Sequence, residues 1–158
     1  MLKIFNLFVF SAVLLCGGEI EITSKQFRAD ELAGRSVFLG SVEAKRGADY
    51  LRGDKMIVLF SQNREVTRFE VTGNTSFFVR MDDNSSYIGE ADEIVYLPAE
   101  RLYTLKGKAW VEDRVNKRKV IGEHIVFNEL TRVADVSGDE AKPVKLIFTI
   151  KDGNDSKP

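Results

Sequence analysis

Apolar and polar residues alternate over many short stretches of the chain, a pattern typical of β-strands with one buried face. The clearest stretches contain Met56, Val58 and Phe60, then Ile94 and Tyr96, then Ile125 and Phe127. Turn-forming pairs such as Gly73-Asn74 and Ser137-Gly138 separate the stretches. No stretch shows a sustained helical period, and residues 24–33 are interpreted as a strand followed by its turn. The sequence therefore predicts an all-β protein.

Two short elements recur three times in the same order along the chain. The first contains a glycine between apolar positions, at Gly40, Gly73 and Gly107, which are 33 and 34 residues apart. The second is a small residue, an acid and then two apolar positions in alternation. It occurs at Gly53-Asp54-Lys55-Met56-Ile57-Val58, at Ala91-Asp92-Glu93-Ile94-Val95-Tyr96 and at Gly122-Glu123-His124-Ile125-Val126-Phe127. We interpret the repeat as a hairpin stacked on copies of itself.

Each part of this repeat has an expected structural role. A glycine inside a strand allows a bulge, a sharp bend or a close backbone approach. The acid is expected to point to solvent, and the two later apolar side chains to line the interior. Stacked hairpins of this kind predict two sheets packed face to face that do not close into a ring, with unpaired edges that invite another chain to add a strand. The first strand is expected at residues 19–23 and the last at residues 144–150.

The two ends of the chain are expected to lie outside this fold. Lys3, the apolar run over residues 4–15 and the small residues Cys16-Gly17-Gly18 have the order of a secretory signal peptide. We expect residues 1–18 to be this signal, residues 19–150 to form the domain, and the chain to be exported. Cleavage after Gly18 is favoured over lipid modification of Cys16, because Leu15 stands where a lipoprotein normally has a small residue. The polar tail, residues 151–158, is expected to be disordered.

Composition narrows the classes of function. The chain has 158 residues, which suits one domain, and its formal net charge of −1 is not that of a typical nucleic-acid binder. His124 is the only histidine and Cys16 the only cysteine, so no zinc site is expected. No nucleophile elbow or glycine-rich phosphate loop occurs. We therefore expect a protein that is not an enzyme and needs no cofactor or metal.

The repeat, the start Ile20-Glu21-Ile22-Thr23-Ser24 and the element Phe38-Leu39-Gly40-Ser41-Val42 resemble the OstA-like family of lipopolysaccharide transport proteins, which includes LptA. The resemblance covers about residues 19–150. It implies an open, V-shaped antiparallel β-jelly-roll that holds lipid A acyl chains in an apolar groove. It also implies head-to-tail association through edge strands, with LptC-like inner-membrane and LptD-like outer-membrane components or with further copies of the chain, forming a bridge between the membranes for outer-membrane assembly.

The candidate groove residues are the apolar residues expected to face inward. They are Ile20, Ile22, Leu39, Met56, Val58, Phe60, Phe69, Phe78, Ile94, Tyr96, Leu105, Trp110, Ile125 and Phe127. The same positions are consistent with an ordinary closed core. Two other functions therefore stay open at this point: a structural scaffold of the cell envelope that assembles through its edge strands, and a carbohydrate-binding β-sandwich. Basic residues gather at turns, as in Lys45-Arg46, but a solvated turn explains such clusters better than a phosphate contact does, so none of them is assigned to a site.

Overall fold

The structure, a computed structural model, describes residues 19–151 and contains ten antiparallel β-strands, with no helix among those residues. The all-β prediction is confirmed. Residues 24–33 form a strand and a turn, as expected, and β10 lies inside the predicted last strand. The strands are β1 (Glu21–Thr23), β2 (Gln26–Asp30), β3 (Arg35–Arg46), β4 (Asp49–Phe60), β5 (Val66–Arg80), β6 (Ser86–Leu97), β7 (Leu102–Asp113), β8 (Arg118–Asn128), β9 (Ala134–Ser137) and β10 (Lys145–Ile147).

A line of β-bulges crosses the middle of the long strands. The three repeated glycines have positive φ angles, at 85° for Gly40, 75° for Gly73 and 78° for Gly107, and the residue after each is also left-handed. At each bulge the pairing shifts by one residue, against β4 at Gly40 and against both neighbouring strands at Gly73 and Gly107. Glycine adopts a positive φ without the steric cost that a Cβ atom imposes. The predicted bulges are therefore confirmed, and they explain why glycine recurs at this spacing.

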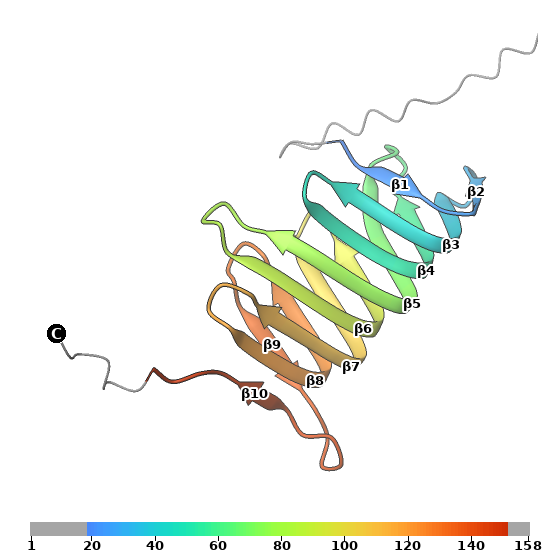
Figure 1. Cartoon of the computed structure of the whole chain (residues 1–158). Helices are drawn as coiled ribbons and strands as arrows, with labels where there is room; N and C mark the ends of the chain where they lie inside the picture. Colours follow the sequence, from blue (N-terminus) through green and yellow to red (C-terminus); the bar gives the residue numbers. More distant parts are fainter. Residues whose placement is uncertain (1–18, 152–158) are drawn as a thin grey trace, which may run out of the picture.

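The bulges divide the sheet into two walls that face each other. Hydrogen bonds run without a break from β1 through β3–β8 to β10, so the predicted pair of sheets is one sheet folded over on itself, as Figure 1 shows. We call the two halves wall A and wall B. Wall A contains β1, β10 and residues 42–46, 49–53, 75–80, 86–91, 109–113 and 118–122. Wall B contains β2, β9 and residues 35–39, 56–60, 66–72, 93–97, 102–106 and 124–128.

The fold line is filled by complementary side chains. On wall A the buried row next to the bulges is mostly small: Val42, Gly53, Thr75, Ala91, Ala109 and Gly122. On wall B the corresponding inward row is larger: Phe38, Met56, Val71, Ile94, Leu105 and Ile125. Close packing of large side chains over small ones lets the two walls meet at a sharp angle. The small residue of the second repeat element therefore marks the fold line.

Aromatic rings join the walls farther from the fold line. The rings of Phe77 and Tyr103 lie 5.2 Å apart, although β6 separates their strands within the sheet. The rings of Tyr87 and Phe127 also lie 5.2 Å apart, again from opposite walls. Both contacts therefore cross the interior. The edges of the folded sheet lie at its two ends, with β1 and β2 at one end and β9 and β10 at the other (Figure 1).

Candidate functional site

The space between the walls changes character from the fold line to the opening. The large wall B row beside the bulges is dry, since Met56, Ile94, Leu105 and Ile125 have no exposed surface. The next row of wall B is aromatic, with Phe69, Tyr96, Tyr103 and Phe127 at adjacent strands. Beyond it, the turns at the open side carry charged side chains. An amphiphile with an apolar tail and a charged head matches this order.

The aromatic row keeps its hydroxyl groups uncharged. The rings of Tyr96 and Tyr103 stack with their centroids 4.3 Å apart, and Phe69 lies 6.1 Å from Tyr96. Burial raises the pKa of Tyr96, with a further increase from the nearby Glu129 carboxylate. Burial likewise raises the pKa of Tyr103 well above its ordinary value. Both side chains are therefore neutral at physiological pH and contribute mainly apolar surface.

A groove opens between the walls at the end of the molecule that carries β1. Its volume is about 50 Å³, and it is open to solvent. Its floor and sides are apolar, formed by Ile20, Ala44, Leu51, Phe69, Tyr96 and Tyr103, and its margin contains Lys45, Arg46, Asp49 and Tyr50. The buried row at the fold line and the ring contacts between the walls occupy the interior next to this groove, so a long acyl chain has to part the walls or move the rings of the aromatic row.

Eleven of the predicted groove residues face the interior. Four of them lie at the open groove or next to it: Ile20, Phe69 and Tyr96 line the groove, and Ile22 packs against the core cluster beside them. The others belong to the core cluster or pack against it: Met56, Val58, Phe60, Ile94, Leu105, Ile125 and Phe127. The alternation of the second repeat element therefore identified inward positions correctly, and the acids Asp54 and Asp92 are exposed, as expected.

Three predicted groove residues lie on the outside instead. Leu39 is 40% exposed and pairs with Lys55. Phe78 stacks on Tyr50 at 5.8 Å, on the face opposite to its buried neighbours. Trp110 donates a hydrogen bond to Glu90 at 3.2 Å and lies under the Lys119 ammonium. In each case a neighbour in the sequence takes the inward position, namely Phe38, Phe77 and the pair Ala109 and Val111.

Several interior residues were missed by the sequence analysis. Phe77, Tyr87 and Tyr103 form the contacts between the walls. Tyr103 lies two residues before the inward-facing Leu105, so the alternation of a strand could have predicted that it faces inward too. Arg46 and Glu129 carry no such signal, because turn residues with charged side chains are ordinarily exposed.

Glu129 is a buried carboxylate at the edge of wall B, in the turn between β8 and β9. Its side chain is fully buried, and Oε2 accepts a hydrogen bond from Arg101 Nε at 3.0 Å. The Glu129 backbone N–H donates to the Arg101 carbonyl oxygen, also at 3.0 Å. Oε1 has no hydrogen-bond partner, an expensive state for a buried carboxylate oxygen. Together with Arg101 it places charge directly behind the aromatic row.

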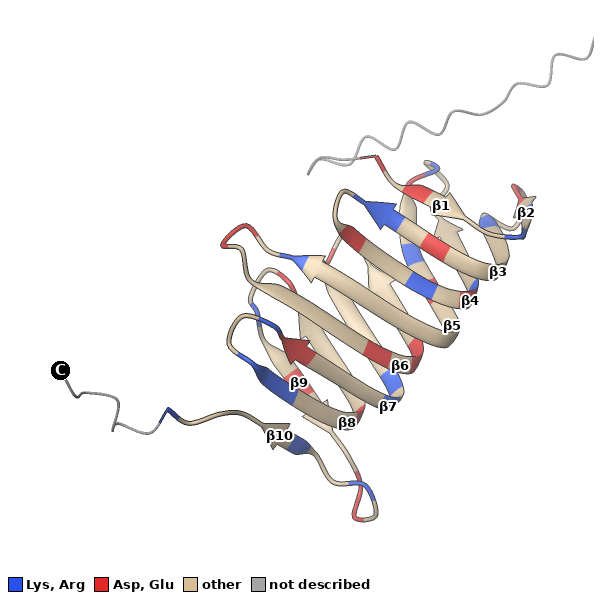
Figure 2. Ribbon diagram, viewed as in Figure 1, with Lys and Arg blue, Asp and Glu red and all other residues tan. Residues whose placement is uncertain are grey.

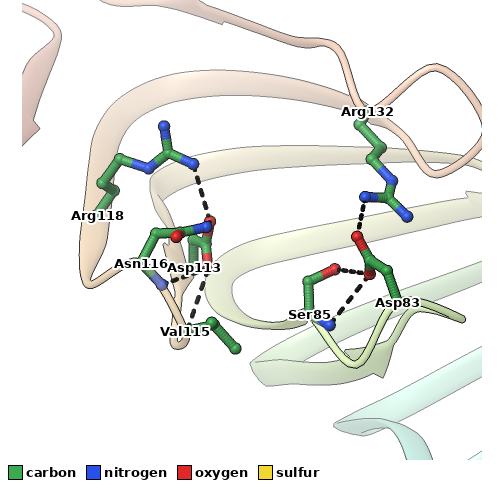
Figure 3. Close-up of polar contacts among 7 residues, drawn as sticks. All are labelled: Asp83, Ser85, Asp113, Val115, Asn116, Arg118 and Arg132. Atoms are coloured by element: carbon green, nitrogen blue, oxygen red, sulfur yellow. Dashed lines mark hydrogen bonds and ion pairs between the residues drawn. The ribbon is translucent and has the colours of Figure 1, made fainter.

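One ion pair spans the opening from wall to wall. Arg132, in the turn that follows wall B, forms an ion pair with Asp83, in the β5–β6 turn of wall A, as Figure 3 shows. Hydrogen bonds from Arg132 and from Ser85 hold the pKa of Asp83 well below its usual range. Both side chains are about half exposed, so the contact between the walls at this point is a solvated ion pair and not a buried apolar contact.

The neighbouring β7–β8 turn of wall A is fixed internally. Asp113 Oδ1 accepts hydrogen bonds from the backbone N–H groups of Val115 and Asn116, while Oδ2 accepts from Asn116 Nδ2 and Arg118 Nη2 (Figure 3). Burial alone raises the pKa of Asp113, but the hydrogen bonds from Asn116 and Arg118 outweigh it, and the pKa lies below its usual value. This turn is therefore held rigidly beside the opening.

No group of three or more histidine, cysteine, aspartate and glutamate side chains within residues 19–151 is arranged to hold a metal ion. No helix in this part of the chain has the length and apolar character needed to cross a membrane.

The comparison with protein families shows to which family the chain belongs. The model for the LptA/(LptD N-terminal domain) lipopolysaccharide transport proteins matches residues 21–133, from β1 to the turn before β9. The chain belongs to this family. Comparison with curated proteins finds no match.

The LptA/LptD N-terminal domain family also accounts for the fold. The structure is similar to the crystal structure of LptH, the LptA-homologous periplasmic component of the lipopolysaccharide transport device from Pseudomonas aeruginosa. The TM-score is 0.75 at 15% identity, and the likeness covers 84% of this chain and 96% of that chain. The V-shaped jelly-roll that the sequence resemblance implied is therefore the fold of this family member.

Proposed function

We propose that this protein is a periplasmic carrier of lipopolysaccharide that holds lipid A acyl chains between its two walls and performs no chemical reaction. The observation that carries the proposal is the gradient of the interior, from the dry row at the fold line through the aromatic row to the charged opening. The open groove beside β1 supplies an entrance of matching character. Family membership supports the class of cargo.

The physical basis of such transport is burial without directional bonds. Each methylene group removed from water contributes about 0.8 kcal/mol, so burying six of them contributes about 5 kcal/mol. Hydrophobic burial depends on area and hardly on orientation. An acyl chain can therefore slide along a row of rings such as Phe69, Tyr96 and Tyr103 without breaking hydrogen bonds one by one. Movement along the interior requires no catalytic group.

We further propose that the two ends of the folded sheet join the protein into a bridge between the inner and outer membranes. The strand edges at β1 and β2 and at β9 and β10 offer unpaired backbone groups, to which a strand of a neighbouring protein can add. β1 carries Glu21 and β10 carries Lys145, so the two edge strands of wall A are opposite in charge (Figure 2). The fitting partners are LptC-like and LptD-like components with the same fold, or another copy of the chain.

Photocrosslinking tests the location of the lipid. A benzoylphenylalanine residue replaces Tyr96 or Phe69, both of which line the groove, and the purified protein is irradiated with lipopolysaccharide. We expect adducts that contain lipopolysaccharide from both positions. The matched control is Thr104, which lies on the outer face of wall B beside Tyr103; Val95 does not serve, because it is 4% exposed. Adducts from Thr104 alone, or from no position of a folded protein, contradict the proposal and favour the scaffold function.

A further inference from the structure

Arg46 is a cation that faces the interior. It is the last residue of β3. Its side chain lies on the inward face of wall A, the same face as the side chains of the buried residues Val42 and Ala44. Its side chain is 28% exposed, and Nη2 reaches Asp49 Oδ2 at 3.4 Å. The other Asp49 carboxylate oxygen accepts a hydrogen bond from the Arg80 backbone N–H at 2.9 Å. Asp49 therefore orients the guanidinium through one long contact, and most of its five N–H donors stay available.

A second guanidinium approaches the same place from the opposite wall. Arg101 lies in the turn between β6 and β7 of wall B, and its Nε is bonded to Glu129. Arg46 and Arg101 both lower the pKa of Tyr96, although burial and Glu129 raise it overall. The charge of Arg46 also lowers the pKa of Arg101, against a larger increase from Glu129. Arg101 is compensated by its hydrogen bond to Glu129, whereas the contact of Arg46 with Asp49 is long, so Arg46 is the stronger attraction for an anion beside the Tyr96 hydroxyl group.

The position of Arg46 relative to the groove indicates which anion fits. Lys45 and Arg46 form one margin of the groove, while Leu51, Phe69 and Ile20 form its apolar floor and sides. A ligand that fills the groove and also reaches this margin therefore needs an apolar part and a negatively charged group that are only a few bonds apart. A guanidinium binds phosphate oxygens with two parallel hydrogen bonds, a geometry that an ammonium group does not reproduce.

We propose that Arg46 binds a phosphate group of lipid A while an acyl chain of the same molecule lies in the groove. Arg101 contributes long-range attraction from the opposite wall, and Lys45 attracts the anion at the margin. This inference rests on the proposed function, because it assumes that lipid A enters between the walls. It adds a recognition element for the headgroup, which burial of acyl chains alone does not provide.

The test compares two lipids that differ only in phosphate. Binding of diphosphoryl lipid A and of dephosphorylated lipid A is measured by displacement of a fluorescent fatty acid, for the unchanged protein and for Arg46→Gln. We expect the unchanged protein to bind the phosphorylated lipid about tenfold more tightly, the range of one charge-assisted contact. In Arg46→Gln this preference falls to about twofold or less, while binding of the dephosphorylated lipid is unchanged. The preference of the unchanged protein should weaken as salt is raised.

Arg68→Gln is the matched control. Arg68 lies on the outer face of wall B and is ion-paired with Glu70 at 2.7 Å, so the variant also removes one paired arginine. We expect it to keep the full preference for phosphate. Thermal unfolding of both variants establishes that they fold.

Each remaining outcome contradicts a stated part of the proposal. If Arg46→Gln keeps the preference, Arg46 is not the phosphate site. If the unchanged protein binds both lipids equally, this inference fails and the proposed function stands. If neither lipid displaces the fatty acid, the proposed function itself fails. If phosphatidylglycerol vesicles compete as well as diphosphoryl lipid A, the site recognises phospholipid, and the assignment to lipid A is wrong.

Discussion

Individual residues at the fold line determine how closely the walls approach. Gly53 is buried in wall A, and a Cβ atom at this position would collide with the Val71 side chain of the neighbouring strand and come within 3.3 Å of the Thr72 and Gly73 carbonyl oxygens. Val71 has no exposed surface and cannot move into solvent. The glycine that opens the first copy of the second repeat element therefore has a steric reason, because a side chain at this position would have to displace Val71.

Substitution at Gly53 tests this explanation. We expect Gly53→Ala to lower the free energy of unfolding by about 1–3 kcal/mol, the usual cost of forcing a methyl group into a packed core. Urea denaturation measures the change. The variant Val71→Ala removes the obstructing methyl groups. The double variant should therefore lose clearly less free energy of unfolding than the sum of the losses in the two single variants. Strict additivity would mean that Gly53 is required for another reason.

At the residue scale, sequence reasoning succeeded where one apolar residue stands between polar ones and failed where apolar residues are adjacent. Met56 and Ile125 follow the small residue and the acid of the repeat, and both are fully buried. In Phe77-Phe78 two aromatic residues compete for one inward position, and hydrophobicity alone does not choose between them. Counting in twos from Phe69 selects Phe77, which is the buried ring. The prediction for Trp110 failed for the opposite reason: its side chain is larger than those of Ala109 and Val111, which hold the inward positions.

At the scale of elements, the repeat predicted the stacked hairpins but not how each strand contributes to both walls. In β4 the inward residues are Gly53 and then Met56, three positions apart, whereas in β5 the bulge preserves the period of two. Period-two patterning thus breaks at the fold line in every second strand. A sequence with this interruption can be assigned to two short strands or to one folded strand. Hydrogen bonding through the bulge, which the pattern does not encode, decides the question.

The last strand is the element with the weakest attachment. β10 pairs with only Lys119–Ile121 of β8, and Leu146, Ile147 and Phe148 are all at least half exposed. Leu146 pairs with Val120, whose side chain packs against the core. Leu146 therefore extends the inner face of wall A past the residues that cover this face. An apolar inner face without an opposite wall fits the end of a neighbouring protein better than it fits water.

Substitution in β10 tests assembly through this end. We expect Leu146→Asp to reduce self-association, because the incoming edge would have to bury a carboxylate. Sedimentation velocity over a range of concentrations measures the effect. Val115→Asp is the control, since Val115 is similarly exposed but lies in the β7–β8 turn rather than on a strand edge. Equal loss of association in both variants would point to general repulsion, and no loss in either would remove β10 from the interface.

At the scale of the whole molecule, a filled interior has to be reconciled with a lipid carrier. The dry row at the fold line is continuous from Met56 to Ile125, whereas the opposite side is closed by the Asp83–Arg132 ion pair and by ring contacts such as Tyr87–Phe127. Exposed ion pairs contribute little to stability. The walls are therefore fastened strongly at the fold line and weakly at the opening. This difference predicts that they part like a hinge, with the bulges as its axis.

Linking the two sides of the opening tests whether parting is required. Asp83→Cys and Arg132→Cys place one thiol on each wall, and a short bismaleimide joins them. Because the cysteine at position 16 precedes residues 19–151, these are the only thiols in that part of the chain. We expect the linked protein to take up lipopolysaccharide at least about tenfold more slowly than the unlinked variant, since an acyl chain can no longer separate the walls.

The control for this experiment links two turns of the same wall. Asp83→Cys with Val115→Cys joins the β5–β6 and β7–β8 turns, which both belong to wall A and lie side by side through the hydrogen bond from the Arg114 N–H to the Ser86 carbonyl oxygen. This link leaves the opening free, so uptake should stay close to that of the unlinked protein. If the link between the walls has no effect, lipid enters through the groove beside β1 without separating them. The rings of Tyr96 and Tyr103 would then have to move aside instead, and replacing Tyr103 by a smaller apolar residue would speed uptake.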